Sequence, residues 1–225
     1  MPGQNLRTRR MQRTREDVAR TAAGLFLTQG YERTAVDQIA DVAEVSPRTV
    51  FRYFPAKEDL VLAPLTASGD ALVAALRSRP EEENPTRAMR AAFGSVLRTQ
   101  EEGGASGVDA SLLRLIDRTP GLNAELLHRA AGLAARLAEV IAEREGVHTG
   151  SDLRPQLMVA VFAAAGRVAM RNWCGKESTT ASHIGTLLES VLDQMDPGLF
   201  GDWRGRTGPA RGATATSLPR PVPGP

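Results

Sequence analysis

The sequence predicts an all-α protein. Apolar residues recur at the three- and four-residue spacing of amphipathic helices along almost the whole chain, and no stretch shows the sustained alternation of a half-buried strand. Of the 225 residues, 42% are hydrophobic and 24% are charged, which is the ordinary range of a folded globular protein. This composition excludes collagen-like and wholly disordered architectures. A chain of this length forms one large or two small domains.

Two helices are predicted before residue 45. A stripe of apolar residues predicts a helix over about residues 15–29, and Gly30 follows as its stop. Thr34 and Asp37 have the three-residue spacing of a capping box, which predicts the start of a second, short helix.

A third helix is predicted directly after the second. Ser46 is a preferred N-terminal capping residue, and Pro47 at the first helical position lacks an N–H that would be unpaired there in any case. The predicted buried face of this helix consists of Val50, Phe51 and Phe54. The second and third helices, joined by a tight turn, predict a helix-turn-helix over about residues 35–54.

The rest of the chain predicts a longer helix followed by four or five more. Thr119 and Pro120 have the pattern of a helix start, and Gly146 that of a helix end. The predicted ranges are about residues 57–79, 84–100, 110–117, 120–145, 152–174 and 180–195, with a Gly-rich loop at 103–107. The whole chain therefore predicts about nine helices.

The two ends of the chain differ in composition from its middle. Residues 1–15 contain five arginines and no acid, a bias that suits a polyanionic partner. We expect residues 1–13 to form a basic flexible arm. We expect residues 198–225 to be a disordered tail, because a segment so rich in Pro and Gly cannot bury enough apolar area to offset its ordering entropy. Between them, residues 14–60 and 61–197 are predicted as two helical domains.

The outer face of the third helix has side chains that suit recognition of a nucleic acid. In a helix-turn-helix the second helix enters the major groove while the first crosses the backbone. Arg48 and Arg52 lie one turn apart, and each can donate a bidentate pair to a guanine. Ser46 and Tyr53 offer hydroxyls to phosphates, and Lys57 at the start of the next helix offers charge.

These residues closely resemble the DNA-binding domain of the TetR family of bacterial transcriptional regulators. The resemblance rests on Gly30-Tyr31 through Thr34, Ile39-Ala40 and the stretch VSPRTVFRYFPAKEDL at 45–60, and it covers about residues 14–62. It implies a homodimeric repressor with an N-terminal three-helix DNA-binding domain and a larger helical domain for ligand binding and dimerisation. Two-fold symmetry in turn predicts a palindromic operator.

The resemblance also implies which residues contact DNA. Base contacts are implied for Pro47, Arg48, Thr49 and Arg52, and phosphate contacts for Ser46, Tyr53 and Lys57; Thr34 completes the predicted DNA-binding set. Ala35 stands where a hydroxyl residue is common in the family, and Arg48 stands where Gly is frequent. The second departure predicts a different operator and not a loss of DNA binding.

The second half of the chain matches the family only in the number and order of its helices. The stretch from Leu112 through Arg118-Thr119-Pro120 to Glu145-Gly146 is similar to a subset of actinobacterial members whose ligand domains are associated with acyl-CoA-like molecules. The effector is therefore predicted to be apolar or acyl-CoA-like. The predicted ligand-binding residues are Met89, Phe93, Leu97, Met158, Phe162 and Arg167, although Met and aromatic residues at this spacing are also typical of a plain core.

The last two predicted helices carry apolar stripes at the spacing of a bundle interface. Two such helices from each subunit would form a four-helix dimer seam. The predicted interface residues are Leu157, Val161, Ala165 and Val168 on one helix and Ile184, Leu187, Leu188, Val191, Leu192 and Met195 on the other. Arg167 and Arg171 could hold an acidic ligand or pair with acids such as Glu189 at this seam.

The sequence lacks the residues that several classes of function require. Cys174 is the single cysteine, so no internal disulfide is expected. His128, His148 and His183 have no Cys or acid at ligand spacing, so we expect no metal and no cofactor. No nucleophile and base set is recognisable, and the longest uncharged apolar run, residues 157–166, is too short to span a membrane. We expect a cytoplasmic protein without enzymatic activity, associated with the nucleoid when it is bound to DNA.

Two alternatives stay open at this point. A helical interaction protein that does not bind DNA could use the same scaffold, and salt-dependent binding to a palindromic fragment would distinguish it. An activator, or a regulator without a small ligand, would have the same sequence features as a ligand-responsive repressor.

Overall fold

The computed structural model describes residues 2–102, 110–174 and 183–194. These residues form nine α-helices and no strand, which confirms the predicted fold class. The helices are α1 (Pro2–Gln29), α2 (Val36–Val42), α3 (Pro47–Tyr53), α4 (Asp59–Arg77), α5 (Pro85–Glu102), α6 (Ala110–Arg118), α7 (Pro120–Glu145), α8 (Arg154–Cys174) and α9 (His183–Asp193). The predicted loop at 103–107 and tail at 198–225 lie outside the described residues.

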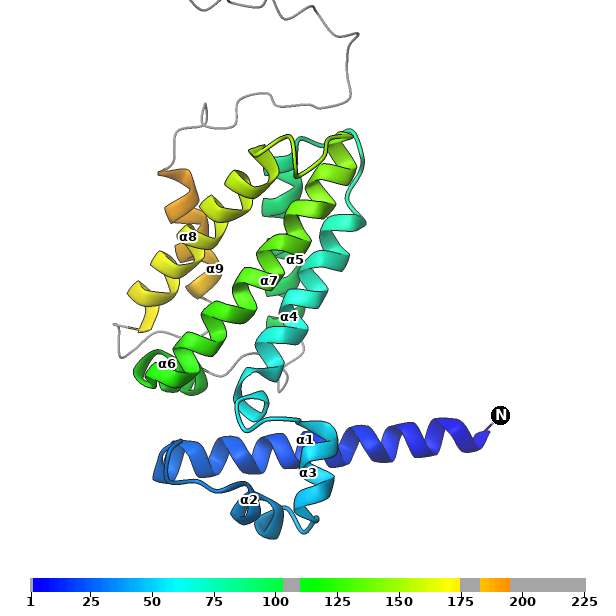
Figure 1. The fold of residues 1–225 in the computed structure, drawn as a ribbon, viewed down its shortest axis with the longest axis vertical. Helices are drawn as coiled ribbons and strands as arrows, with labels where there is room; N and C mark the ends of the chain where they lie inside the picture. Colours follow the sequence, from blue (N-terminus) through cyan, green and yellow to red (C-terminus); the bar gives the residue numbers. More distant parts are fainter. Residues whose placement is uncertain (1, 103–109, 175–182, 195–225) are drawn as a thin grey trace, which may run out of the picture.

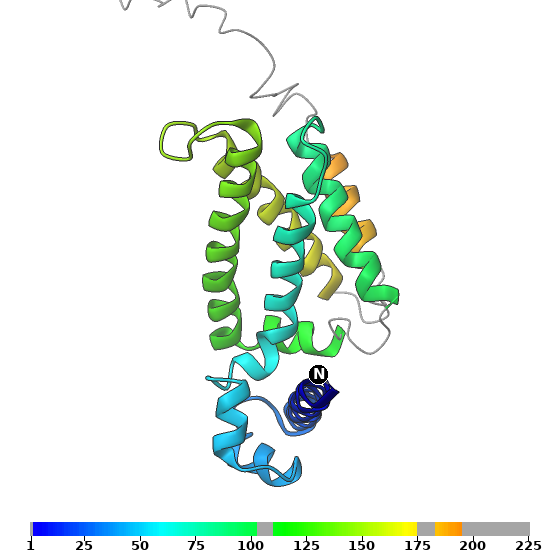
Figure 2. The ribbon, with the colours of Figure 1, turned by 90° about the vertical axis from the view of Figure 1, so that its right-hand side faces the viewer.

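The helices form a three-helix unit and a larger bundle. The unit of α1, α2 and α3 lies at one end of the molecule, and α4 leads from it into the bundle (Figure 1). Within the bundle α4 packs against α5 and α7, and α8 packs against α7 and α9. α1 lies across the end of the bundle in Figure 1 and is seen nearly end-on in Figure 2. The N-terminal half of α1 extends beyond the rest of the three-helix unit (Figure 1).

α1 begins earlier than the sequence predicts. It starts at Pro2 and not near Arg15, so the residues expected to form an arm are helical. Arg and Gln are good helix formers, and Gln12 donates to Glu16 one turn on, at 2.7 Å. This segment has no apolar stripe, so hydrophobic periodicity could not reveal it. The predicted stop is confirmed, because Gly30 has φ +90° and its N–H donates to the Phe26 carbonyl at 3.0 Å.

α2 starts without the predicted capping box. Its N-terminal capping residue is Ala35, which makes no side-chain capping bond. Thr34 is only 1% exposed; its hydroxyl donates to the Gly30 carbonyl at 2.8 Å and accepts from Gln29 Nε2 at 3.2 Å. Thr34 therefore closes the connection between α1 and α2 from the inside, and helix α2 begins too late for its hydroxyl to cap it.

The turn between α2 and α3 is a Schellman motif. The Val45 N–H donates to the Ala40 carbonyl at 2.9 Å, and the Glu44 N–H donates to the Asp41 carbonyl at 3.2 Å. Glu44 has φ +53°, the left-handed conformation that favours Gly at this position. The motif ends α2 sharply and sets the direction in which α3 leaves.

One hydrophobic core joins the three-helix unit to the bundle. Val18 and Phe26 of α1 belong to the same buried cluster as Leu113 and Ile116 of α6 and Trp173 of α8. A second cluster lies inside the bundle between α4, α5, α7 and α8, and a third joins α8 to α9. Buried contacts thus continue across the boundary expected near residue 60.

α4 is the helix among the described residues that is long and apolar enough to cross a bilayer, with a mean hydropathy of 1.4 in its most apolar window. The length of uncharged apolar runs does not reveal it, because Asp70 interrupts the segment. In the structure α4 packs on α1, α5 and α7, and Leu62 and Leu76 are fully buried. A central helix of a bundle meets the same length and hydropathy criterion, so α4 is weak support for membrane insertion.

Candidate nucleic-acid interface

α3 buries one face and exposes the other. Val50 and Phe54 lie in the core with 0% and 2% exposure, and Pro47, Arg48 and Arg52 are exposed. Ser46 caps the helix as predicted, because its hydroxyl accepts from the Thr49 N–H at 3.2 Å. The Ser46 and Thr49 hydroxyls are also hydrogen-bonded to each other at 2.9 Å. Capping and burial together fix α3 with its cationic side outward.

The prediction that Phe51 belongs to the buried face is wrong. Its side chain is 48% exposed. Val50 and Phe54 are one turn apart and occupy the inner side of this short helix, and Phe51 lies about 100° around the axis from Val50, toward the side of Arg48. A spacing of three residues can place a side chain on either of two adjoining faces, and spacing alone does not show which of them is covered.

The two arginines of α3 differ in their surroundings. Arg48 makes no hydrogen bond or ion pair with any described residue. The Arg52 guanidinium lies over the Tyr53 ring, 4.9 Å from its centroid, and donates to the Tyr53 hydroxyl at 3.2 Å. Arg52 is therefore oriented by its neighbour before any ligand arrives, whereas Arg48 is free to adapt.

Lys57 lies in the loop after α3 and does not begin the next helix, because α4 starts at Asp59. Its ammonium donates to the Tyr31 carbonyl at 2.7 Å and lies 4.1 Å from the centroid of the Tyr31 ring. The Tyr31 hydroxyl donates to Glu58 at 3.1 Å, and burial together with that carboxylate raises the pKa of Tyr31. Lys57 thus holds the end of α1 to the loop, and only its remaining donors are available for a phosphate.

Thr34 does not reach the surface of the three-helix unit, since it is buried and its hydroxyl is bonded within the chain. The structure thus leaves seven of the predicted DNA-binding residues at or near the surface, and removes Thr34 from the set. They are Ser46, Pro47, Arg48, Thr49, Arg52, Tyr53 and Lys57.

An ion-pair chain ties the loop after α3 to α7. Asp59 accepts from the Ala56 N–H at 2.9 Å through one carboxylate oxygen and from Arg129 Nη1 at 2.8 Å through the other. Arg129 also donates to Glu125 at 2.7 Å. The sequence gives no local signal for this connection, because its members are separated along the chain. It links the bundle to the segment that positions α3.

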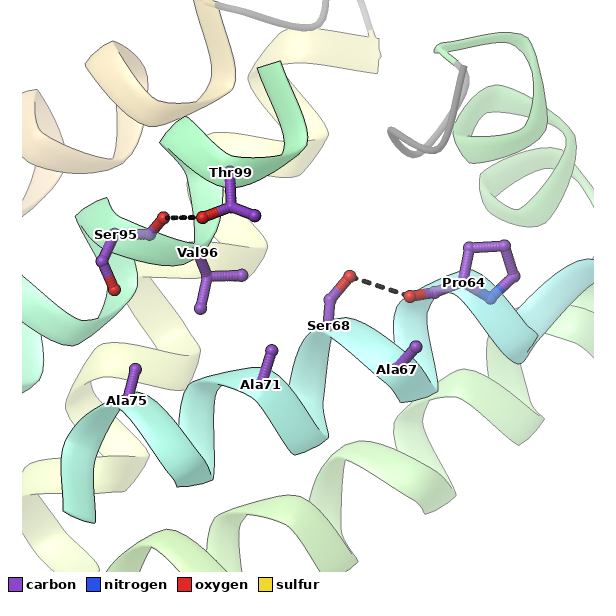
Figure 3. Close-up of a pocket in the computed structure, with 8 residues that line it drawn as sticks. All are labelled: Pro64, Ala67, Ser68, Ala71, Ala75, Ser95, Val96 and Thr99. Atoms are coloured by element: carbon purple, nitrogen blue, oxygen red, sulfur yellow. Dashed lines mark hydrogen bonds between the residues drawn. The ribbon is translucent and has the colours of Figure 1, made fainter. Parts of the chain in front are cut away.

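A cavity of about 320 Å³ lies between α4 and α5 (Figure 3). It is lined by Pro64, Ala67, Ser68, Ala71, Ala75, Ser95, Val96 and Thr99, none of which is charged. The Ser68 hydroxyl donates to the Pro64 carbonyl at 2.8 Å, and the Thr99 hydroxyl donates to the Ser95 carbonyl at 3.0 Å. Ala67 and Ala71 are exposed, so the cavity opens to solvent.

The residues predicted to bind a ligand do not line this cavity. Met89 and Met158 are buried in the bundle core with 2% and 0% exposure, and Phe93 and Phe162 are half-buried beside them. Leu97 is half-buried on α5, and Arg167 is exposed on α8. The large side chains fill the space between the helices, whereas the cavity forms where α4 carries small ones. Small residues carry no strong sequence signal, so the sequence does not predict this cavity.

The residues predicted to form a dimer seam fall into two groups. Ala165, Leu188 and Leu192 are buried in the contact between α8 and α9, with Leu187 and Val191 half-buried at its edge. Leu157 and Val168 are 56% and 48% exposed on the outer side of α8, and Val161 is half-buried. The side chain of Ile184 and the whole of Met195 lie outside the described residues. Among the described residues of the predicted seam, Leu157 and Val168 are the exposed ones.

Glu189 has a partner within the chain. Arg90 of α5 donates to Glu189 at 3.0 Å and to Asp193 at 2.7 Å, which fastens α9 to α5. The suggested pairing of Glu189 with Arg167 or Arg171 across a seam is thus replaced by an internal ion pair. The cause is the approach of α5 to α9, which local sequence patterns do not specify.

Both halves of the chain match described families. Residues 19–63 match the bacterial regulatory proteins, tetR family, and residues 83–200 match the MftR C-terminal domain. The HTH-type transcriptional regulator TcmR of Streptomyces glaucescens is 48% identical over 206 residues, which are 90% of this chain and 91% of that protein. The regulator MftR of Mycobacterium tuberculosis is 26% identical over 202 residues, which are 88% of this chain and 98% of that protein.

Solved structures share the arrangement of helices. The SmeT–triclosan complex has a TM-score of 0.55 at 17% identity and covers 94% of this chain and 99% of its own. Native NalD, the secondary repressor of the MexAB-OprM multidrug efflux pump in Pseudomonas aeruginosa, has a TM-score of 0.54 at 20% identity and covers 81% and 96%. Regulators of the tetR type bind DNA, form dimers and bind small-molecule effectors. Matched in both halves and 48% identical to TcmR over nine-tenths of its length, this chain belongs to the TetR family of transcriptional regulators.

Proposed function

We propose that the protein is a ligand-responsive homodimeric repressor that binds a palindromic operator through α3 and releases it when an effector enters the bundle. It acts in the cytoplasm, on the DNA of the nucleoid. The observation that carries the proposal is the exposed cationic face of α3 on a unit whose core continues into the bundle. Such a unit can read DNA and also respond to a change in the bundle.

The surface of α3 supports base recognition. Arg48 and Arg52 are exposed on the outer side, and α3 contains no acidic residue that would pair with them. A guanidinium fork matches the two acceptors of guanine in the major groove. Ser46 and Tyr53 place hydroxyls beside them, as phosphate contacts require.

The outer side of α8 supports a dimer. Leu157, Val161 and Val168 lie on one face of the helix, and the first and last are about half exposed. A two-fold axis would bring this face against its own copy and bury both. Two reading helices so related would reach half-sites about 34–36 Å apart, which requires a palindromic operator.

The cavity between α4 and α5 supports an uncharged effector. Its lining has apolar atoms and three hydroxyl side chains but no cation that could neutralise phosphates. Of the two predicted effector classes, the apolar class therefore fits this lining better than the acyl-CoA-like class. Pro64 of the lining is close in sequence to Asp59, so a ligand that displaces this part of α4 also acts on the ion pairs of the loop after α3.

Selection of bound fragments from random duplex DNA tests the proposal. We expect an enriched palindrome whose affinity falls steeply as salt rises. Extract of the native cells should then release the protein from that palindrome. A protein that enriches no sequence at low salt would overturn the proposal.

Filling the cavity tests the effector site. Ala71→Leu places a larger side chain in the cavity, whereas Ala74→Leu changes an exposed position of the same helix outside it. We expect Ala71→Leu to bind operator normally and to lose release by the extract, and Ala74→Leu to retain both properties. Equal release from both variants would place the effector elsewhere.

A further inference from the structure

Phe51 is exposed although it is one of the largest apolar side chains of the three-helix unit. Its exposed fraction is 48%, whereas Val50 beside it and Phe54 one turn on are at 0% and 2%. An aromatic ring left in water forgoes the free energy that burial would supply. Phe51 lies on the exposed flank of α3, next to Arg48, and the rest of the three-helix unit leaves about half of its side chain uncovered. A contact that buries the ring must therefore come from outside the unit.

The neighbours of Phe51 indicate which partner covers it. Arg48 is one turn before Phe51, and Arg52 directly follows it, so all three share the exposed side of the helix. α3 has the sequence PRTVFRY and contains no acid. An apolar protein surface would leave both guanidinium groups without partners, whereas a polyanion neutralises them. Charge complementarity therefore selects DNA as the occupant of this face.

The chemistry of phenylalanine limits which groups of the DNA the ring can contact. The ring has no hydrogen-bonding group, so it cannot bond a phosphate or the nitrogen and oxygen atoms of a base edge. In the major groove the apolar group at a base edge is the C5-methyl of thymine. Phe51 lies beside Arg48 on the exposed side of α3, so its ring faces the base edges when α3 enters the major groove, and the thymine methyl is the apolar group that it can meet there.

We propose that Phe51 packs against the C5-methyl group of a thymine in each operator half-site, beside the bases that Arg48 and Arg52 contact. The inference rests on the proposed function, because it requires α3 to enter the major groove. It makes Phe51 a specificity-determining residue, and it predicts that each half-site contains a thymine whose methyl group, and not its hydrogen-bonding edge, is recognised.

Replacement of thymine by deoxyuridine tests the contact with the wild-type protein alone. The exchange removes one methyl group and keeps base pairing and every hydrogen-bonding group. With the selected operator, each thymine of the half-site is exchanged in turn and affinity is measured by fluorescence anisotropy. We expect a loss of about fourfold per half-site at one position, the effect of about one buried methyl group, and no change at thymines away from it.

Variants at position 51 assign the effect to the ring. Phe51→Ala should bind the thymine operator more weakly and show no further loss with deoxyuridine, whereas Phe51→Leu, which remains apolar, should retain part of the sensitivity. Leu27→Ala is the matched control, because Leu27 is 44% exposed on α1 of the same unit. It should bind like the wild type and keep the full fourfold loss.

The outcomes separate this inference from the proposed function. A wild-type protein that binds its operator but tolerates deoxyuridine at every position would overturn the inference and leave the repressor intact. Undiminished sensitivity in Phe51→Ala would also overturn it, since another residue would then contact the methyl group. Failure to bind any duplex would overturn both. Thermal unfolding of each variant checks that affinity losses do not reflect unfolding.

Discussion

Arg48 and Lys57 carry the same charge in different surroundings, and this difference predicts different effects of their removal. Arg48 is exposed and unpaired among the described residues, so Arg48→Ala should cost about 1–3 kcal/mol of operator binding and relax the preference at one base position. Measurement against the operator and its single-base variants checks this. A loss that is uniform across all sequences would show that Arg48 contacts only the backbone.

Lys57→Ala should weaken binding to all sequences alike and flatten the dependence on salt by about one unit of slope. Because the Lys57 ammonium also donates to the Tyr31 carbonyl at 2.7 Å, the substitution should lower folding stability as well, by about 1–2 kcal/mol. Denaturant unfolding of the variant measures that second effect. An unchanged salt slope together with reduced stability would mean that Lys57 serves only to hold the loop.

Glu44 occupies the left-handed position of the Schellman turn with φ +53°. A residue with a Cβ is strained by about 1–2 kcal/mol in that conformation, and Gly is not. We therefore expect Glu44→Gly to be more stable than Glu44→Ala by about 1 kcal/mol, as measured by urea unfolding. Both variants remove the same charge, so their difference isolates the backbone. Equal stability would show that the turn is not strained.

At the scale of helices, two ion pairs join α4 to α7 and only one of them touches the loop after α3. Arg129 pairs with Asp59 at 2.8 Å near that loop, with both side chains about one-quarter exposed, and Arg136 pairs with Asp70 at 2.7 Å on the exposed surface. Asp59 also accepts from the Ala56 N–H, so it connects α7 to the loop after α3. The two pairs form a natural comparison.

Asp59→Asn should reduce the ability of effector to release operator, by a factor of at least three, because the loop is no longer held to α7. Asp70→Asn should leave release unchanged and should lose no more than about 1 kcal/mol of stability, since an exposed pair contributes little. Effector titrations against operator-bound protein measure the difference. Equal release by both variants would contradict a connection through Asp59.

The two ends of α1 differ in how well the local sequence predicts them. Its end at Gly30 is legible in the sequence, because a positive φ after an apolar stripe favours Gly. Its start at Pro2 is not legible, because residues 2–13 are polar and strongly basic and carry no apolar face. Hydrophobic periodicity reveals only the part of a helix that packs against other helices. It does not reveal a segment that extends beyond them.

For the whole molecule, the proposed coupling must be reciprocal. If effector weakens operator binding by a factor within about 5–150, corresponding to 1–3 kcal/mol, operator must weaken effector binding by the same factor. Calorimetric titration of effector into free and operator-bound protein measures both sides. Equal effector affinity in the two states would exclude the proposed mechanism.

Dimer formation through α8 makes a second prediction for the whole molecule. Leu157→Glu with Val168→Glu places charges in the proposed seam, and should raise the dimer dissociation constant more than tenfold and weaken operator binding with it, because buried unpaired charge is costly. Leu127→Glu is the control, since Leu127 is 48% exposed on α7 and outside that face. Sedimentation velocity reports the assembly; a double variant that remains dimeric would place the seam elsewhere.

The sequence by itself determined the all-helical fold, the order of the helices, the helix-turn-helix and the outward arginines of α3, because these follow from spacing and capping along a single stretch of chain. Tertiary structure alone decided that Phe51 is exposed and Thr34 buried, that Glu189 pairs with Arg90, that the cavity lies against the small residues of α4, and that one core spans α1, α6 and α8. The physical reason is that the spacing of residues along a helix specifies which face each of them occupies. The helices that pack against that face determine whether its side chains are buried, paired or exposed.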